Sequence, residues 1–300
     1  MKKIVVSVLN YLVIFSVFGQ ENALHKEIRH AKEANTRFEN VVFTRTSADT
    51  EVLKDFFNPD EVSFFENSSF HSKYNDTKAI NLSIPFKTAS IVLELVEVAA
   101  YFYDYEILTS DWEIFFPNKD IKHFRGVVKG DEHSLAAITL YEDEVMGLIA
   151  TNEGNFSIVK NKKLGRHLVY NDNNLKEKTD WVCNTEDDLC VSYDDDGLLD
   201  NRGDLSDSKV DFRSTSINKI VKFYVETEFN IFQDLGSVAA VEAYVMALFN
   251  QVGVLYHNEE ISTGVSFLHI WTSNVSYPYT CKNTSDDLLD QFQNILYPIC

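Results

Sequence analysis

An acidic stretch divides this chain of 300 residues into two parts. Residues 194–207 read DDDGLLDNRGDLSD, with six aspartates, two glycines and leucine as the only apolar residue type. A segment of this composition buries too little apolar surface to offset the conformational entropy lost on folding. We therefore expect a linker over 194–216, with one folded region before it and one after it.

Two other interpretations of the linker compete with that of a flexible connection. Alternating aspartates before Gly197 suggest a calcium loop, but the full D-x-[DN]-x-[DN]-G spacing with its closing glutamate is missing. Arg202-Gly203-Asp204 matches an integrin-binding tripeptide, a pattern short enough to recur by chance. An exposed acidic segment with one arginine is more simply a place where a protease cuts, so we predict maturation cleavage at Arg202 and Gly203.

The first region is expected to be exported and β-rich. Lys2 and Lys3 precede an apolar run that is too short to span a membrane, which predicts a secretory signal peptide over 1–19. Over 20–193, short apolar or alternating runs are separated by glycine and asparagine turns, which favours an antiparallel sandwich or barrel. These runs are Ile91–Leu95, Ala99–Ile107, Leu135–Tyr141 and Val145–Ala150. An amphipathic helix is expected ahead of them, over 24–34.

The second region, 217–300, has the pattern strand, helix, strand, helix. Alternation over Ile217–Val225 and an apolar run over Ile261–Trp271 predict the strands, and Ser285 is placed to cap the last helix. The long helix between the strands starts at Asp234 or Ser237 and carries an apolar stripe expected to face the core. The stripe consists of Val238, Val241, Val245, Leu248, Val252 and Leu255.

This order predicts two neighbouring parallel strands with a helix packed across them. Two strands cannot shield both faces of a sheet. Unless strands come from elsewhere, we expect apolar sheet surface to be exposed, and we expect the natural domain to continue past Cys300.

The net charge excludes some classes of partner. The formal charge is −19, and no cluster of lysine or arginine provides a local basic patch. Such a chain repels nucleic-acid phosphate and anionic lipid, so we expect no nucleic-acid and no membrane partner.

Four cysteines leave two roles open. Cys183, Cys190, Cys281 and Cys300 are an even number in an exported chain, which favours disulfides, and three pairings are possible. Cys183, close before the linker, could instead present a thiolate to zinc at the position a catalytic water needs. Spacing alone favours a disulfide between Cys183 and Cys190.

Catalytic motifs are missing from the chain. None of the eight histidines is followed by glutamate and no two lie four residues apart, so there is no H-E-x-x-H zinc helix. The G-x-S-x-G elbow, the phosphate loop and the dinucleotide-binding turn are also missing. Carboxylates are too abundant for any pair to be diagnostic, and His269, in a predicted strand, is expected to be structural.

Two sequence blocks nevertheless resemble a known family. His123-Phe-Arg-Gly-Val-Val-Lys-Gly, followed by Val145–Ile149 and Gly154–Ile158, resembles the pro-domain of reprolysin/ADAM-type zinc metallopeptidases, which are metzincins. Ile220–Phe229, with Asn250-Gln-Val, Ile270-Trp-Thr-Ser and Thr284–Phe292, resembles the start of the catalytic domain in secreted bacterial members. Together the blocks cover most of residues 80–300, in the family's order.

The resemblance implies a β-rich pro-domain over 20–193 and an incomplete α/β metzincin-type domain over 217–300. It implies the precursor portion of a secreted zinc metalloendopeptidase, acting on protein or peptide substrates, whose pro-domain binds its own catalytic domain. Cys183 falls where the family places its cysteine switch, an inhibitory zinc ligand, although Asn184 departs from the usual Gly-Thr that follows.

The same resemblance limits what can be assigned. Lys222 stands near where some relatives use a calcium-binding glutamate, which puts that site in doubt. No catalytic residue can be carried over, so the chain alone is expected to be inactive. The alternative is a secreted non-catalytic binding or adhesion protein with the same folds.

Overall fold

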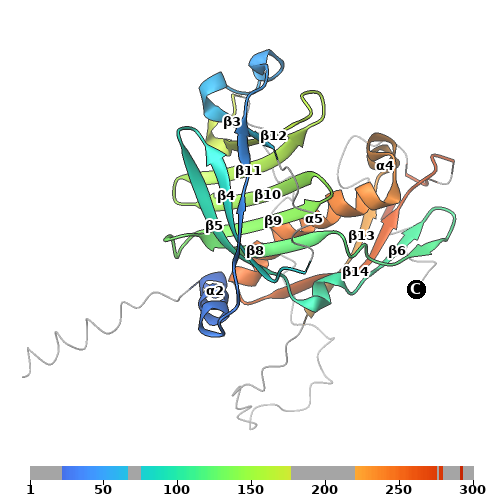
Figure 1. Ribbon diagram of the computed structural model, residues 1–300. Coiled ribbons are helices and arrows are strands. Elements are labelled where there is room, and N and C mark those ends of the chain that lie inside the picture. The colour runs from blue at the N-terminus through green and yellow to red at the C-terminus, as the bar shows by residue number, and fades with distance from the viewer. Residues whose placement is uncertain (1–21, 67–75, 177–219, 276, 280–290, 293–300) are drawn as a thin grey trace, which may run out of the picture.

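The computed structural model describes residues 22–66, 76–176, 220–275, 277–279 and 291–292. Within these residues the chain forms a ten-stranded, barrel-like sheet and a smaller four-stranded sheet, and the long helix α5 lies between them (Figure 1). The prediction of a β-rich, largely antiparallel first region is confirmed. The predicted signal peptide, the linker and the start of the helix at Ser285 lie outside the described residues.

The barrel strands follow one another in the order β1-β4-β5-β8-β9-β10-β11-β12-β3-β2. Their bounds are β1 Glu39–Val42, β2 Thr44–Thr46, β3 Val62–Glu66, β4 Ala79–Phe86, β5 Ala89–Glu97, β8 Lys122–Val128, β9 Leu135–Tyr141, β10 Glu144–Thr151, β11 Gly154–Asn161 and β12 Arg166–Asn171. Short 3-10 helices occur at Thr50–Leu53, Pro59–Glu61, Ala100–Tyr103 (η3) and Asp172–Asn174. All the strand pairs are antiparallel except β1 with β4, so the sheet is mixed.

A single segment nearly closes the barrel. β1 pairs with β4 at one edge, and β2, which follows after Phe43, pairs with β3 at the other edge. The backbone N–H of Phe43 donates to the carbonyl of Ser83 at 2.9 Å, so the crossing residue is also hydrogen-bonded. A barrel closed in this way leaves little unpaired strand edge exposed to another chain.

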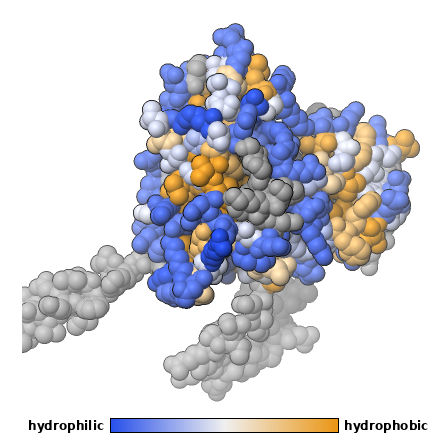
Figure 2. Space-filling model, in the orientation of Figure 1, coloured by the Kyte–Doolittle hydropathy of each residue, from blue (hydrophilic) through white to orange (hydrophobic). Residues whose placement is uncertain are grey.

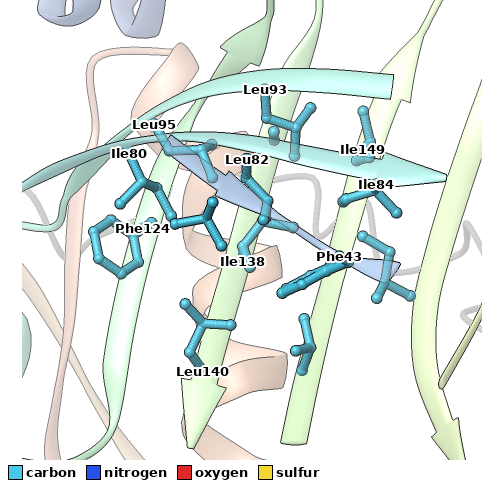
Figure 3. Close-up of a cluster of buried hydrophobic side chains, with 14 of the residues drawn as sticks. Phe43, Ile80, Leu82, Ile84, Leu93, Leu95, Phe124, Ile138, Leu140 and Ile149 are labelled. Atoms are coloured by element: carbon cyan, nitrogen blue, oxygen red, sulfur yellow. The ribbon is translucent and has the colours of Figure 1, made fainter. Parts of the chain in front are cut away.

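The barrel interior is filled by alternate residues of its strands. Figure 3 shows aliphatic side chains from β4, β5, β9 and β10 meeting around the rings of Phe43 and Phe124. The largest of these side chains are shielded from solvent almost completely: Ile80, Leu82, Ile84, Leu93, Leu95, Phe124, Ile138 and Ile149. Burying each of these side chains contributes roughly 2 kcal/mol to stability relative to leaving it exposed. Because so many are buried together, this cluster is the main apolar core of the described residues.

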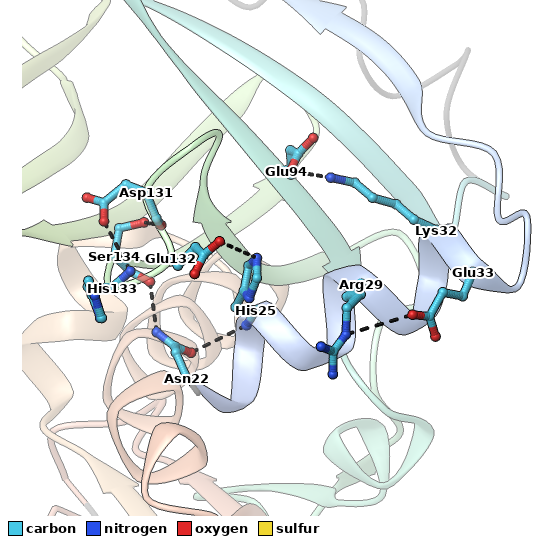
Figure 4. A network of polar contacts seen from close by, with 10 residues as sticks. All are labelled: Asn22, His25, Arg29, Lys32, Glu33, Glu94, Asp131, Glu132, His133 and Ser134. Atoms are coloured by element: carbon cyan, nitrogen blue, oxygen red, sulfur yellow. Dashed lines mark hydrogen bonds and ion pairs between the residues drawn. The ribbon is translucent and has the colours of Figure 1, made fainter. Parts of the chain in front are cut away.

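Helix α2 (Ala23–Glu33) covers the outside of β5 and β8, as the prediction of a helix over 24–34 anticipated. Asn22 caps it: its side-chain oxygen accepts from the N–H of Leu24 at 2.8 Å, while its amide donates to the carbonyl of Ser134 at 3.1 Å (Figure 4). Near its other end, Lys32 forms an ion pair with Glu94 of β5 at 2.7 Å. The helix is therefore attached to the barrel at both ends.

The second sheet draws its strands from both sides of the linker. Its order is β13-β14-β6-β7, where β13 is Ile220–Thr227, β14 Ser262–Ile270, β6 Glu106–Thr109 and β7 Ile114–Phe115. β13 and β14 are parallel, as predicted, and β6 joins the free edge of β14, also in parallel. The condition that strands might come from elsewhere is thus met, because the first region provides two strands of this sheet.

Helix α5 (Val238–Asn258) begins after its predicted cap, as the Ser237 hydroxyl accepts from the N–H of Ala240 at 3.2 Å. The shorter α4 (Phe229–Leu235) precedes it. By length and composition α5 could cross a membrane, but half of its most apolar window is buried between the two sheets.

The prediction of which side chains of α5 are buried is only partly correct. Val241 and Val245 are buried, whereas Leu248, Val252 and Leu255 are 40%, 48% and 48% exposed. In their place Asn250, Gly253 and Val254 are buried. The reason is that the barrel contacts the second half of the helix from another side, where the close approach selects small and polar residues.

The run Ala99–Ile107 was expected to be one strand, but it contains η3 (Ala100–Tyr103) before β6 begins at Glu106. The 3-10 turn directs Phe102 and Tyr105, three residues apart, to the same side, where they are 1% and 5% exposed. An uninterrupted strand would have placed these two side chains on opposite faces.

Two buried histidines make stability depend on pH. Burial, with smaller contributions from nearby Arg125 and Lys160 respectively, lowers the pKa of His123 to about 3 and that of His167 to about 4. An unfolded histidine titrates near 6.5, so between that pH and these values the unfolded chain binds more protons. The free energy of unfolding should therefore be highest above about pH 6.5, where both histidines are neutral in either state, and should fall as the pH drops towards 4.

Urea unfolding at a series of pH values measures this loss. Replacing both histidines, as His123→Asn with His167→Asn, should flatten the slope below pH 6.5. As a control, His133→Asn alters an exposed side chain and should leave the slope unchanged. An equal slope in the double variant and the parent would show that other groups carry the dependence.

Candidate functional site

Within the described residues, a buried polar contact between the two regions lies where β8, β9 and η3 meet the inner face of α5. We call this contact the junction; its buried polar side chains are His123, Arg125, Thr139, Glu242 and Asn250. Arg125 and His123 belong to the His-Phe-Arg-Gly block and Asn250 to the Asn-Gln-Val block. The two blocks that carry the family resemblance are therefore in direct contact.

Arg125 is the cation of the junction. It is 4% exposed, its Nε–H donates to Oδ1 of Asn250 at 2.8 Å, and its guanidinium lies 5.0 Å from the ring centre of Phe102. A buried guanidinium is tolerated only where such acceptors and ring faces replace water. The arginine therefore links the barrel wall to α5 and to η3 at the same time.

Asn250 connects β8 and β9 to the helix through its other end. Its amide Nδ2 lies 3.4 Å from the carbonyl of Phe124, 3.3 Å from that of Ile138 and 3.3 Å from Oγ1 of Thr139. Asn250 is completely buried. An asparagine side chain suits this place because its oxygen can accept from the guanidinium while its NH2 group donates to the backbone carbonyls.

Gly253 allows the helix to come this close. A Cβ added there would lie 2.3 Å from Nη2 of Arg125 and 3.2 Å from Oγ1 of Thr263, both closer than normal contact. Any larger residue at this turn of α5 would displace the guanidinium.

Glu242 forms the second buried polar contact of the junction, two turns before Asn250. Its Oε1 accepts from the hydroxyl of Tyr105 at 2.7 Å and from the N–H of Asn118 at 2.8 Å, and the residue is 2% exposed. Burial raises the pKa of the carboxyl, whereas the bonds from Asn118 and Tyr105 lower it. Both donors belong to the first region, so this carboxylate also fixes α5 to it.

A second cluster of polar side chains lies towards the carboxyl ends of β13 and β14. This is the side at which open parallel sheets bind ligands. The hydroxyl of Tyr224 is 3.1 Å from Nδ1 of His269, and the indole N–H of Trp271 donates to Glu226. Burial lowers the pKa of His269, and Glu226 opposes that shift. The structure places His269 in a strand at 8% exposure, where Nδ1 contacts Tyr224 and the buried Nε2 has no hydrogen-bond partner among the described residues.

Lys222 occupies a place lined by oxygen. Its Nζ lies 2.7 Å from the carbonyl of Asp104, 3.2 Å from Oδ2 of the same residue and 3.4 Å from the carbonyl of Val265. An ammonium held in this way repels a divalent cation, so calcium would have to bind elsewhere.

Several predicted site residues cannot be compared with the structure. Cys183, Cys190, Cys281 and Cys300, the proposed cleavage region at Arg202 and Gly203, and the aspartates of the linker all lie outside the described residues. Among the residues that are described, no group of three or more His, Cys, Asp or Glu side chains is arranged to hold a metal ion.

Sequence reasoning missed the junction as a site, although a signal for it was present. Glu242 and Asn250 are polar residues of a largely apolar helix, eight residues apart and thus near the same face. A carboxylate and an amide in such a helix indicate buried polar partners.

Comparisons with known proteins leave the family open. No protein-family model matches this chain, and a search of the curated proteins finds no match to it. The resemblance to metzincins therefore rests on the residues of the two blocks alone.

Proposed function

We propose that this chain is the latent precursor portion of a secreted zinc metalloendopeptidase. In this proposal the region 20–193, which contains the barrel, is the pro-domain and the β13-α5-β14 unit begins the catalytic domain. The observation that carries it is the bond from Arg125 to Asn250, which joins the two blocks that resemble the family. A pro-domain must recognise its own catalytic domain, and a buried hydrogen bond between specific polar side chains provides such recognition.

Latency would come from Cys183 together with the junction. A thiolate bound to zinc would occupy the coordination position that a catalytic water needs, so peptide-bond hydrolysis in protein substrates would be blocked until cleavage. The chain contains no H-E-x-x-H, so by itself it should not hydrolyse peptides. The ligands that would complete the zinc site are not among its residues.

Thiol labelling of the precursor tests the role of Cys183. In the protein expressed from its complete reading frame, we expect Cys183 to be protected from an alkylating reagent while zinc is bound and to react after a chelator removes the metal. The variant Cys183→Ser should have peptidase activity before cleavage. Equal labelling with and without zinc, or a Cys183–Cys190 disulfide in the mass spectrum, would contradict the switch.

A secreted, non-catalytic binding protein is the second candidate, and one observation favours it. Apolar side chains gather over the second sheet and its β6–β7 turn, at the right of Figure 2. The exposed ones are Trp112, Ile114, Phe115, Phe116, Val221, Tyr224 and Phe267. A surface of this kind commonly marks a protein-binding site. An H-E-x-x-H encoded downstream of Cys300 would favour the peptidase, and a natural stop codon there the binding protein.

A further inference from the structure

The edge of β14 is completed by a strand from the other side of the linker. β6 pairs with β14 in parallel over four residues, from Glu106 opposite Phe267 to Thr109 opposite Ile270 (Figure 1). Without β6, this edge would expose the backbone groups of β14, which readily accept an extended segment. The first region is therefore a strand donor to the second sheet.

Apolar packing extends this strand pairing towards α5. Ile107 of β6 is fully buried, and with Phe102 and Tyr105 it shares a core with Val241 and Leu268 of the second region. This core contains residues from both sides of the linker, so separating the regions would expose it to water on both sides.

The buried polar contacts make partial opening of the junction costly. Arg125 is a charged group and Glu242 an ionisable one, both almost fully buried, and their partners lie across the junction. Partial opening would leave a buried charge without its partner, which is costly, so the contact should open as a whole or not at all.

A third contact lies at the far end of α5. Leu24 and Ile28 of α2 pack against Val254, and Nε2 of His257 lies 2.8 Å from Glu27. The first region therefore contacts α5 along its length, from Glu242 to His257.

We infer that the two regions form a stable non-covalent complex and that cutting the linker does not separate them. The partner of the β14 edge is the chain's own segment Glu106–Thr109, and the partner of α5 is the barrel wall. For activation, which rests on the proposed function, linker cleavage alone would then be insufficient. A second event, such as a cut within the first region, would have to remove β6.

The experiment cuts the folded chain at one defined place. A recognition site for a sequence-specific protease is inserted between Arg202 and Gly203, the chain is cut to completion, and the product is run on a sizing column with a reducing agent, which removes any disulfide across the cut, but without denaturant. We expect both fragments in one peak at the position of the uncut chain, and two separate peaks once denaturant is added. Two peaks without denaturant, at micromolar concentration, would overturn the inference.

A pair of variants in one hairpin tests the role of β6. Ile107→Asp puts a charge into the shared core, so the cut protein should dissociate at least about tenfold faster. Trp112→Asn changes an exposed residue with φ of 62°, which asparagine tolerates, and should leave the rate unchanged. Should Ile107→Asp fail to fold, hydrogen exchange on the cut parent protein decides, because β14 amides should stay as protected as in the uncut chain. Loss of protection after the cut would contradict strand donation whatever becomes of the zinc proposal.

Discussion

Asn250→Leu should lower the free energy of unfolding by about 3 kcal/mol. Leucine has the heavy-atom number and branching of asparagine but accepts no hydrogen bond, so the Nε–H of Arg125 would lose its acceptor in a place that is 4% exposed. The carbonyls of Phe124 and Ile138 would lose a donor as well. Urea unfolding, followed by tryptophan fluorescence, measures the change.

Two further variants make this measurement specific. Val252→Leu, on the exposed side of the same helix, should change stability by less than about 0.5 kcal/mol. In an Arg125→Met background, Asn250→Leu should cost much less, because the Nε–H that loses its acceptor is then missing. A cost of Asn250→Leu that is equal in both backgrounds would show that the arginine and the asparagine are not coupled.

Gly126→Ala should be comparably damaging, at about 3 kcal/mol or complete loss of folding. A Cβ at Gly126 would lie 2.0 Å from the carbonyl oxygen of Glu94 and 3.0 Å from Cα of Leu95. These are backbone atoms of β5, paired with β8 at this point, so relief requires the ladder between the two strands to move. Thermal unfolding of the purified variant measures the effect.

Gly130 provides the matched control for this substitution. It has φ of 86° and no atom within 4 Å of an added Cβ, so Gly130→Ala tests backbone strain without steric contact. That strain should cost only about 1 kcal/mol. If the two alanine variants were equally stable, the close approach of β5 and β8 at Gly126 would not matter to the fold.

The local elements of this protein could be predicted because each depends on short-range patterns. Alternating apolar residues predicted β9, β10, β13 and β14, and Ser237 marked the start of α5. Asn22 is a similar signal for α2, as its side chain accepts from two backbone N–H groups. Such patterns act over one turn of helix or two residues of strand, and they are visible in one chain.

The face that α5 buries could not be predicted in full. Periodicity assigned Leu248, Val252 and Leu255 to the core, since it recognises only apolar character. The structure instead buries Asn250 and Gly253, because a second surface, the barrel wall, contacts the helix there. Periodicity finds the apolar side of a helix but cannot show how many surfaces contact it.

The sequence by itself determined the β-rich texture of the first region, the strand-helix-strand order of the second, and the lack of a catalytic zinc motif. Only the tertiary structure decided that β6 joins β14 and that Arg125 meets Asn250, residues that lie 125 positions apart in the chain. Strand order and buried polar pairing depend on which surfaces face each other after folding. No pattern within a short window of the chain contains that information.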